Sequence, residues 1–176
     1  MQIRLRPFVY TDAPAVAQLA NHPQIDRYLR HDFPRPYEVE HALSFCEACE
    51  LNEQDGLSLH RIIEADGKAV GLISAEFSHR VEDCGVEIGY WLGVPFWNQG
   101  IMTQALRLWT DILLTEYTWA QRLVCQILVG NTASARVAEK AGYEKEAVLR
   151  DSLYKNGEVM DVMLYVCLRR HWRCMD

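Results

Sequence analysis

The first part of the chain alternates short strand-like and helix-like patterns of apolar residues. Residues 3–6 alternate apolar and charged side chains, as a half-buried strand does. Residues 14–20 begin a helix just after Thr11 or Asp12, both good helix-capping residues. Residues 38–52 carry apolar side chains at helical spacing. This part of the chain therefore predicts one strand followed by two helices.

Strand patterns dominate the middle of the chain. Residues 57–64 and 68–78 are apolar runs joined by an Asp-Gly turn, which favours a hairpin. Residues 85–92 form a third strand pattern, and a loop that contains proline and glycine follows at 93–100. Three consecutive strands are therefore predicted before the second half begins.

The last part mixes helical and strand patterns again. The expected elements are a helix at 103–117, a strand at 123–128, a short helix after Asn131 or Thr132, and strands at 143–150 and 159–168 around an Asn-Gly turn. Strand–helix–strand units here predict parallel pairing, whereas hairpins predict antiparallel pairing. We expect one α/β domain over residues 1–176, with a mixed, mostly antiparallel sheet of about seven strands flanked by helices.

Composition removes several classes of function. The formal net charge is −6, which argues against nucleic-acid binding. No apolar run approaches the roughly 20 residues that span a membrane, and the N-terminal residues lack a signal-peptide pattern, so we expect a cytoplasmic protein. Cys46 and Cys49 form the one close cysteine pair, and no second pair or His-Glu motif completes a metal site. We expect no metal, and the oligomeric state is left open.

Residues 97–105 carry the strongest chemical signal. Gly100 lies between a predicted strand and a predicted helix, where it lets backbone N–H groups approach an anion. The helix N-terminus adds about half a positive charge directed at the same point. Neither a dinucleotide-binding nor a P-loop glycine pattern is present. The loop therefore predicts a pyrophosphate site built from backbone groups.

Several motifs in one order resemble a known family. They are Trp97-Asn-Gln-Gly-Ile-Met-Thr, the preceding Glu87-Ile-Gly-Tyr-Trp-Leu, the later Asn131-x-x-Ser-x-x-Val-Ala-Glu-Lys-Ala-Gly-Tyr, and a tail that begins Val148-Leu-Arg-Asp. Together they resemble the GNAT superfamily of acetyltransferases, in the RimJ/RimL-like branch that acetylates ribosomal-protein N-termini. Trp97 stands where the superfamily pattern has Gln or Arg, and Met102 where it has Gly or Ala.

The resemblance implies an acyl-CoA N-acyltransferase fold that binds acetyl-CoA as the acyl donor. It places the pyrophosphate on Asn98, Gln99, Gly100, Ile101, Met102 and Thr103. It places the pantetheine arm along Trp91, Leu92 and Gly93, with a hydrogen bond from Asn131, and Ser134 near the thioester sulfur. The alternative for Asn131 and Ser134 is helix capping, which both residue types do well.

Acetyl transfer requires a neutral amine, so a base is useful. Glu87 alternates with Val86 and Ile88, so its side chain points away from theirs and is our candidate base. Ser134 is our candidate proton donor to the leaving sulfur. Asp151 and Glu158 remain alternative bases, and an ordinary exposed strand glutamate is the structural alternative for Glu87.

The expected reaction moves an acetyl group to an amine, with a protein or peptide N-terminal amine as the leading acceptor. A small amine such as a polyamine, an aminoglycoside or an amino acid is the first alternative. A non-catalytic module that only binds acyl-CoA is the second.

Overall fold

The computed structural model describes residues 1–28, 33–77, 83–155 and 157–173. The strands are β1 (Ile3–Pro7), β2 (Ser58–Ala65), β3 (Lys68–Phe77), β4 (Gly85–Leu92), β5 (Arg122–Leu128), β6 (Glu144–Lys155) and β7 (Glu158–Leu168). The helices are α1 (Ala13–Ala20), α2 (Pro23–Asp26), α3 (Val39–Gln54), α4 (Ile101–Glu116) and α5 (Thr132–Lys140), with short 3-10 turns at Tyr10–Asp12, Val94–Phe96 and Arg169–His171. The seven strands predicted from the sequence are all present.

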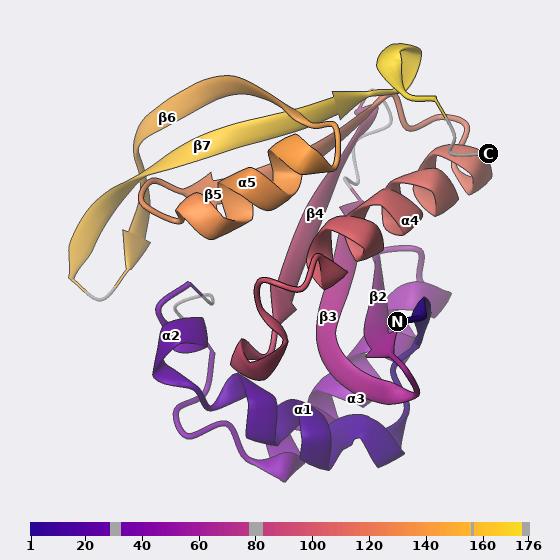
Figure 1. Cartoon of the computed structure of the whole chain (residues 1–176), viewed down its shortest axis with the longest axis vertical. Helices are drawn as coiled ribbons and strands as arrows, with labels where there is room; N and C mark the ends of the chain where they lie inside the picture. The colour runs from indigo at the N-terminus through magenta and orange to yellow at the C-terminus, as the bar shows by residue number, and fades with distance from the viewer. Residues whose placement is uncertain (29–32, 78–82, 156, 174–176) are drawn as a thin grey trace.

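One mixed sheet joins the seven strands in the order β1-β2-β3-β4-β5-β7-β6 (Figure 1). The pairing of β4 with β5 is parallel, and the other pairings are antiparallel. This confirms the predicted fold class. The parallel pairing expected between β5 and β6 was wrong, because β7 lies between them and pairs with both. A hairpin partner competes for the same backbone groups, and here it displaces the direct crossover.

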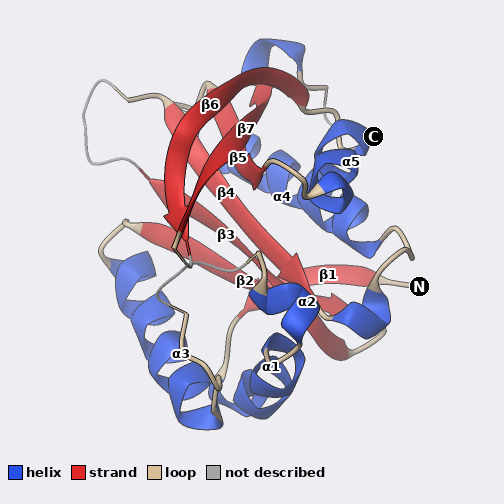
Figure 2. Ribbon diagram, turned by 90° about the vertical axis from the view of Figure 1, so that its left-hand side faces the viewer, coloured by secondary structure: helices blue, strands red, loops and turns tan. Residues whose placement is uncertain are grey.

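Helices cover both faces of the sheet (Figure 2). On one face α4 and α5 pack on a large core that includes Val86, Ile88 and Leu123. On the other face α1 and α3 pack on a smaller core around Ile62 and Leu72. Burying apolar side chains on both faces stabilises the central strands and fixes which residues of β4 point to each side.

Two boundaries differ from the sequence prediction. The helix α4 begins at Ile101 instead of 103, because Gly100 takes a left-handed φ of +76° and forms its N-cap. The helix α2 was not predicted; Pro23 opens it, and the His22 ring accepts a hydrogen bond from the Gln24 amide. The predicted Asn-Gly turn between β6 and β7 includes Asn156, which lies outside the described residues.

Candidate active site

The parallel strands β4 and β5 separate part of the way along their length. They pair at three positions, from Gly85 with Arg122 to Glu87 with Val124. Beyond these positions β4 continues paired with β3, and β5 continues paired with β7 (Figure 1). The facing backbone groups of the two strands therefore diverge in the middle of the sheet, where an extended ligand arm can pair with them.

The loop after β4 is held against the end of that strand. The indole Nε1 of Trp97 donates a 2.6 Å hydrogen bond to the backbone oxygen of Leu92, and its ring packs on the large core. The side chain of Gln99 donates to the backbone oxygen of Pro95 at 3.0 Å. These two bonds fix the path of the chain from β4 to α4. Trp97 therefore supports the loop from within.

The start of α4 faces this loop without a side-chain cap. Gly100 is the N-cap residue, so no cap side chain bonds to the N–H groups of the first turn. Asn98 also has a left-handed φ, of +61°, and consecutive turns of this kind direct backbone N–H groups toward a common point. Ile101 and Met102 are buried in the large core, so the longer side chain at 102 does not enter the loop. The arrangement suits an anion bound by backbone N–H groups.

The start of α5 meets β4 at the same opening. The side-chain oxygen of Asn131 accepts a hydrogen bond from the Ser134 amide at 3.2 Å, so Asn131 does cap the helix. The hydroxyl of Tyr90 on β4 donates to the Ser134 backbone oxygen at 3.1 Å. These bonds engage both backbone groups of Ser134. Its hydroxyl and the Asn131 amide nitrogen have no hydrogen-bond partner among the described residues, so both remain for a ligand.

Glu87 lies on the opposite face of the sheet. Its neighbours Val86 and Ile88 are buried under α4, whereas Glu87 is exposed, as the strand alternation predicted. Its Oε2 accepts a 2.8 Å hydrogen bond from Gln126 Nε2 on β5, which orients the carboxylate. Glu76 on β3 is its direct cross-strand partner. Two carboxylates therefore lie side by side next to the strand opening.

A cavity of about 330 Å³ lies at these residues. Its lining comes from the end of β3, the start of β4 and the middle of β5, namely Glu76, Phe77, Gly85, Val86, Glu87, Val124 and Gln126. Its charged side chains are acidic, so it attracts a cationic ligand. Glu87 could therefore act as a proton acceptor for a ligand bound in this cavity.

The remaining donor-site candidates, Trp91, Leu92 and Gly93, lie in different surroundings. Leu92 is buried in the large core, whereas Trp91 packs on the smaller core of the other face. The Gly93 amide donates to the Val70 backbone oxygen at 2.8 Å, and a Cβ there would lie 2.6 Å from the end of the Leu19 side chain, which would have to shift to make room for it.

The two alternative bases lie in the β6–β7 hairpin, away from this cavity. Asp151 and Glu158 are both exposed, and neither lines the cavity at Glu87. The Asp151 amide donates to Asp161 at 2.9 Å, at an irregularity of β6 where Asp151 has a φ of +50°. Glu87 is therefore the candidate base that the fold brings to the strand opening.

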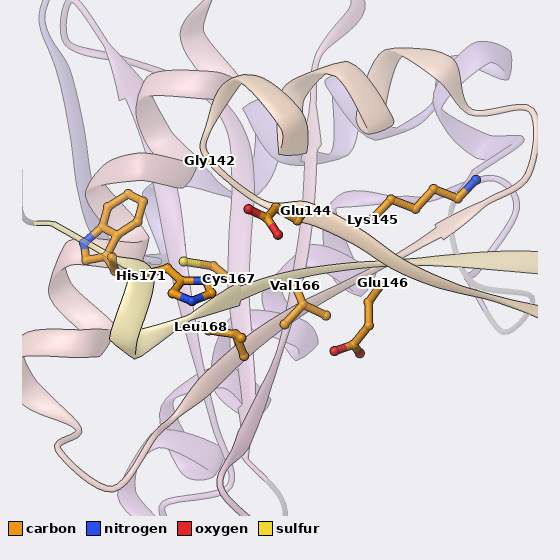
Figure 3. A pocket seen from close by; sticks show the side chains of 9 residues that line it. Gly142, Glu144, Lys145, Glu146, Val166, Cys167, Leu168 and His171 are labelled. Atoms are coloured by element: carbon orange, nitrogen blue, oxygen red, sulfur yellow. The ribbon is translucent and has the colours of Figure 1, made fainter.

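A second, smaller hollow of about 130 Å³ lies at the far end of the sheet. Figure 3 shows Glu144, Cys167 and His171 around it, from the start of β6, the end of β7 and the terminal turn. None of the candidate catalytic or donor-binding residues lines it. Within the described residues, no group of three or more His, Cys, Asp or Glu side chains is placed to hold a metal ion. No described helix is long and apolar enough to cross a membrane.

Sequence reasoning did not identify Tyr90, Gln126 or Glu76 as parts of the site. Tyr90 shares the large-core face of β4 with Val86 and Ile88 and reads as an ordinary core aromatic. Burial raises its pKa well above the usual value for tyrosine, so its hydroxyl stays protonated and acts as a donor. Gln126 and Glu76 alternate with buried neighbours, as any strand surface residue does. The alternation of buried and exposed residues that identified Glu87 could also have identified Gln126 and Glu76.

A mixed sheet that opens between two parallel strands, with two helix N-termini at one face and a carboxylate at the other, defines an acyltransferase of the acyl-CoA N-acyltransferase fold. The sequence matches the acetyltransferase (GNAT) domain family over residues 2–144, and the chain belongs to that family. This membership confirms the predicted family and, at the level of the family, the prediction of an N-acetyltransferase.

Two relatives of known sequence and one solved structure are similar to the chain. A putative ribosomal N-acetyltransferase, YdaF of Bacillus subtilis, is 35% identical over 109 residues, which are 61% of this chain and 57% of the relative. A ribosomal-protein-serine acetyltransferase of Escherichia coli is 32% identical over 117 residues, which are 64% of this chain and 62% of that one. The matched part is thus less than two thirds of either relative.

The solved structure is RimL, a ribosomal alpha-N-protein acetyltransferase in complex with coenzyme A. It superimposes with a TM-score of 0.85 at 26% identity, and the match covers 96% of this chain and 94% of that one. Nearly the whole described chain therefore shares the RimL fold.

Proposed function

We propose that the protein is an acetyl-CoA-dependent N-acetyltransferase whose acceptor is the N-terminal amine of a protein or peptide. The observation that carries this proposal is the opening between β4 and β5. The uncapped start of α4 and the start of α5 lie at one face of the opening, and Glu87 lies at the other. A donor bound on the helix side and an amine on the carboxylate side would meet between the strands.

The proposed donor site uses the residues expected from the sequence. Asn98 through Thr103 would hold the pyrophosphate with backbone N–H groups, and Trp91–Gly93 at the end of β4 would line the pantetheine arm. The Asn131 amide nitrogen would donate to the same arm. The relative RimL was solved with coenzyme A, which supports this choice of ligand.

The proposed mechanism is direct transfer. Glu87 removes a proton from the amine, and the neutral nitrogen attacks the thioester carbonyl. The tetrahedral intermediate collapses and the carbon–sulfur bond breaks. The Ser134 hydroxyl gives its proton to the leaving thiolate and regains one as the positively charged nitrogen loses its second proton to form the neutral amide. Normal turnover in Ser134→Ala would contradict that last step. The acidic cavity favours a cationic acceptor, as an amine is before it loses its proton.

The donor is tested by thermal unfolding with acetyl-CoA, with NAD and ATP as comparison ligands. Saturation at about 100 times the dissociation constant adds roughly 2.7 kcal/mol, which raises Tm by about 5–10 °C for a chain of this size. Gly100→Glu should abolish the shift. Gly67→Glu is the matched control, because Gly67 has a similar φ of +80° and equally open surroundings but lies in the β2–β3 turn. No shift in the wild type would contradict the proposed donor.

The acceptor is tested by mass spectrometry and thiol release. The screen compares short peptides that have free N-terminal Ser, Ala or Met with the same peptides blocked at the N-terminus, and with spermidine, an aminoglycoside and free amino acids. Acetylation of the free peptides alone is the expected result. Acetylation of small amines alone would favour a small-molecule enzyme. Binding of acetyl-CoA without thiol release would favour a non-catalytic module.

The ribosomal names of two relatives support a protein acceptor. We also place the protein in the cytoplasm. The five cysteines in the described part of the chain are free thiols, which fits a reducing compartment.

A further inference from the structure

Lys155 is the one buried residue of the twelve in β6, whose other side chains are exposed or half-exposed. Its exposed fraction is 3%, against 65% for the adjacent Tyr154. Lysine is almost never fully buried unless its charge has partners. An interaction with another part of the fold must therefore hold this side chain in place.

Two of the groups that Lys155 contacts lie at the end of α2. Its Nζ donates to the backbone oxygens of Asp26 at 3.1 Å and Arg27 at 2.8 Å, across 129 and 128 residues of sequence. Carbonyl oxygens at the end of a helical turn lack partners within the helix, so an ammonium group is a suitable donor to them. Figure 1 shows α2 close to the free tip of the β6–β7 hairpin.

This contact connects the two flanks of the strand opening. On one flank, α1 leads into α2, and Leu19 of α1 packs directly on Gly93 at the end of β4. On the other flank, β6 pairs with β7, and β7 pairs with β5 as far as Leu128. These contacts therefore form a closed ring of elements. The ring runs from β4 through α1 and α2, crosses to the β6–β7 hairpin at Lys155, and returns through β7 to β5.

We infer that Lys155 is a positioning residue for the acceptor, which fixes α2 against the β6–β7 hairpin and thereby shapes the acceptor side of the opening. The inference rests on the proposed function, because it assigns this ring to the acceptor. Most donor contacts lie at the starts of α4 and α5, and the ring reaches the donor site only at Gly93, through Leu19. Lys155 itself contacts α2 and none of these donor residues in the described structure. Loss of the contact should therefore weaken acceptor binding and leave donor binding unchanged.

The test compares Lys155→Met with Lys155→Arg and with the control Lys145→Met, which changes an exposed lysine of the same strand. Methionine keeps an unbranched side chain in the buried site but cannot donate. We expect Lys155→Met to fold, because Ile25 stays buried in α2 and the ion pair between Asp26 and Arg35 remains.

The readouts are the acceptor KM, kcat and the acetyl-CoA Kd, with a free-N-terminus peptide that the wild type acetylates. Lys155→Met should raise the acceptor KM about ten-fold and leave kcat and the acetyl-CoA Kd within about two-fold. Lys155→Arg should restore most of the loss, and Lys145→Met should match the wild type. Hydrogen exchange should accelerate in peptides covering residues 22–27 and 150–155 of Lys155→Met alone.

Two kinetic results would each overturn the inference. One is an unchanged acceptor KM in folded Lys155→Met, and the other is an equal rise in the acceptor KM and the acetyl-CoA Kd, which indicates general loosening. Failure of the proposed function is distinguishable, because the wild type itself would then acetylate no amine in the screen. Unchanged hydrogen exchange in both segments would exclude the contact itself, whatever the activity.

Discussion

The hydroxyl of Tyr90 on β4 donates a hydrogen bond to the backbone oxygen of Ser134 in α5, 3.1 Å away and 44 residues later in the chain. The bond crosses the region where β4 and β5 no longer pair. It fixes the first turn of α5 to the strand that leads into the glycine loop. The start of α5 and the strand before the glycine loop, both parts of the proposed donor site, are therefore fixed relative to each other.

Tyr90→Phe should lower turnover with little change in fold. The ring keeps its packing in the core, but the Ser134 oxygen loses a donor, which costs about 1 kcal/mol, or about five-fold in rate. Steady-state kinetics with acetyl-CoA would measure the change. Tyr154→Phe is the control, because Tyr154 is 65% exposed on β6. Wild-type kcat in Tyr90→Phe would show that Ser134 is positioned without this bond.

The difference between local and distant relationships explains which parts were predictable. Gly100 and Asn131 act on their own helix starts, so their roles follow from a few neighbouring residues and were visible in the sequence. Glu87 was placed on its face by strand alternation. The Tyr90 and Lys155 contacts join segments 44 and more than 120 residues apart, and no local pattern encodes such pairs. The insertion of β7 between β5 and β6 was missed for the same reason.

Glu87→Gln should lower kcat/KM by about 100-fold, because a positioned general base contributes at least that much. Glutamine keeps the shape of the side chain and an oxygen that accepts from Gln126, so the strand surface is preserved. Steady-state kinetics with a free-N-terminus peptide would measure the loss. Asp151→Asn and Glu158→Gln should behave as the wild type. A larger loss of kcat/KM in either hairpin variant would indicate that the base lies in the β6–β7 hairpin and not at Glu87.

Trp97→Phe should weaken acetyl-CoA binding about five-fold. The substitution keeps a ring against the core but removes the Nε1 donor to the Leu92 oxygen, so the loop before α4 becomes less ordered. Isothermal titration with acetyl-CoA would measure Kd directly. Trp119→Phe is the control, since Trp119 is 44% exposed and packs near Phe77, away from the loop. An unchanged Kd would mean that the loop keeps its conformation without the indole.

His60 makes the stability of the fold depend on pH. Burial is the largest cause that lowers its pKa from 6.5 to about 4; the nearby Arg61 adds to this effect and Glu53 opposes it. Its Nε2 lies 3.1 Å from the Ser58 hydroxyl, and its Nδ1 is buried without a hydrogen-bond partner in the described structure. The folded state therefore holds this ring neutral in a range where the unfolded chain binds a proton.

Because the unfolded state binds more protons between about pH 4 and 6.5, the free energy of unfolding falls as the pH falls through that window. The contribution of His60 is fully present above pH 6.5, and its loss near pH 4 amounts to about 3 kcal/mol. His60→Gln, which does not titrate, should have a flatter profile of unfolding free energy against pH in urea. His171→Gln, at an exposed position in the last turn, should keep the wild-type slope. Equal slopes in the wild type and His60→Gln would show that carboxylates alone cause the acid sensitivity.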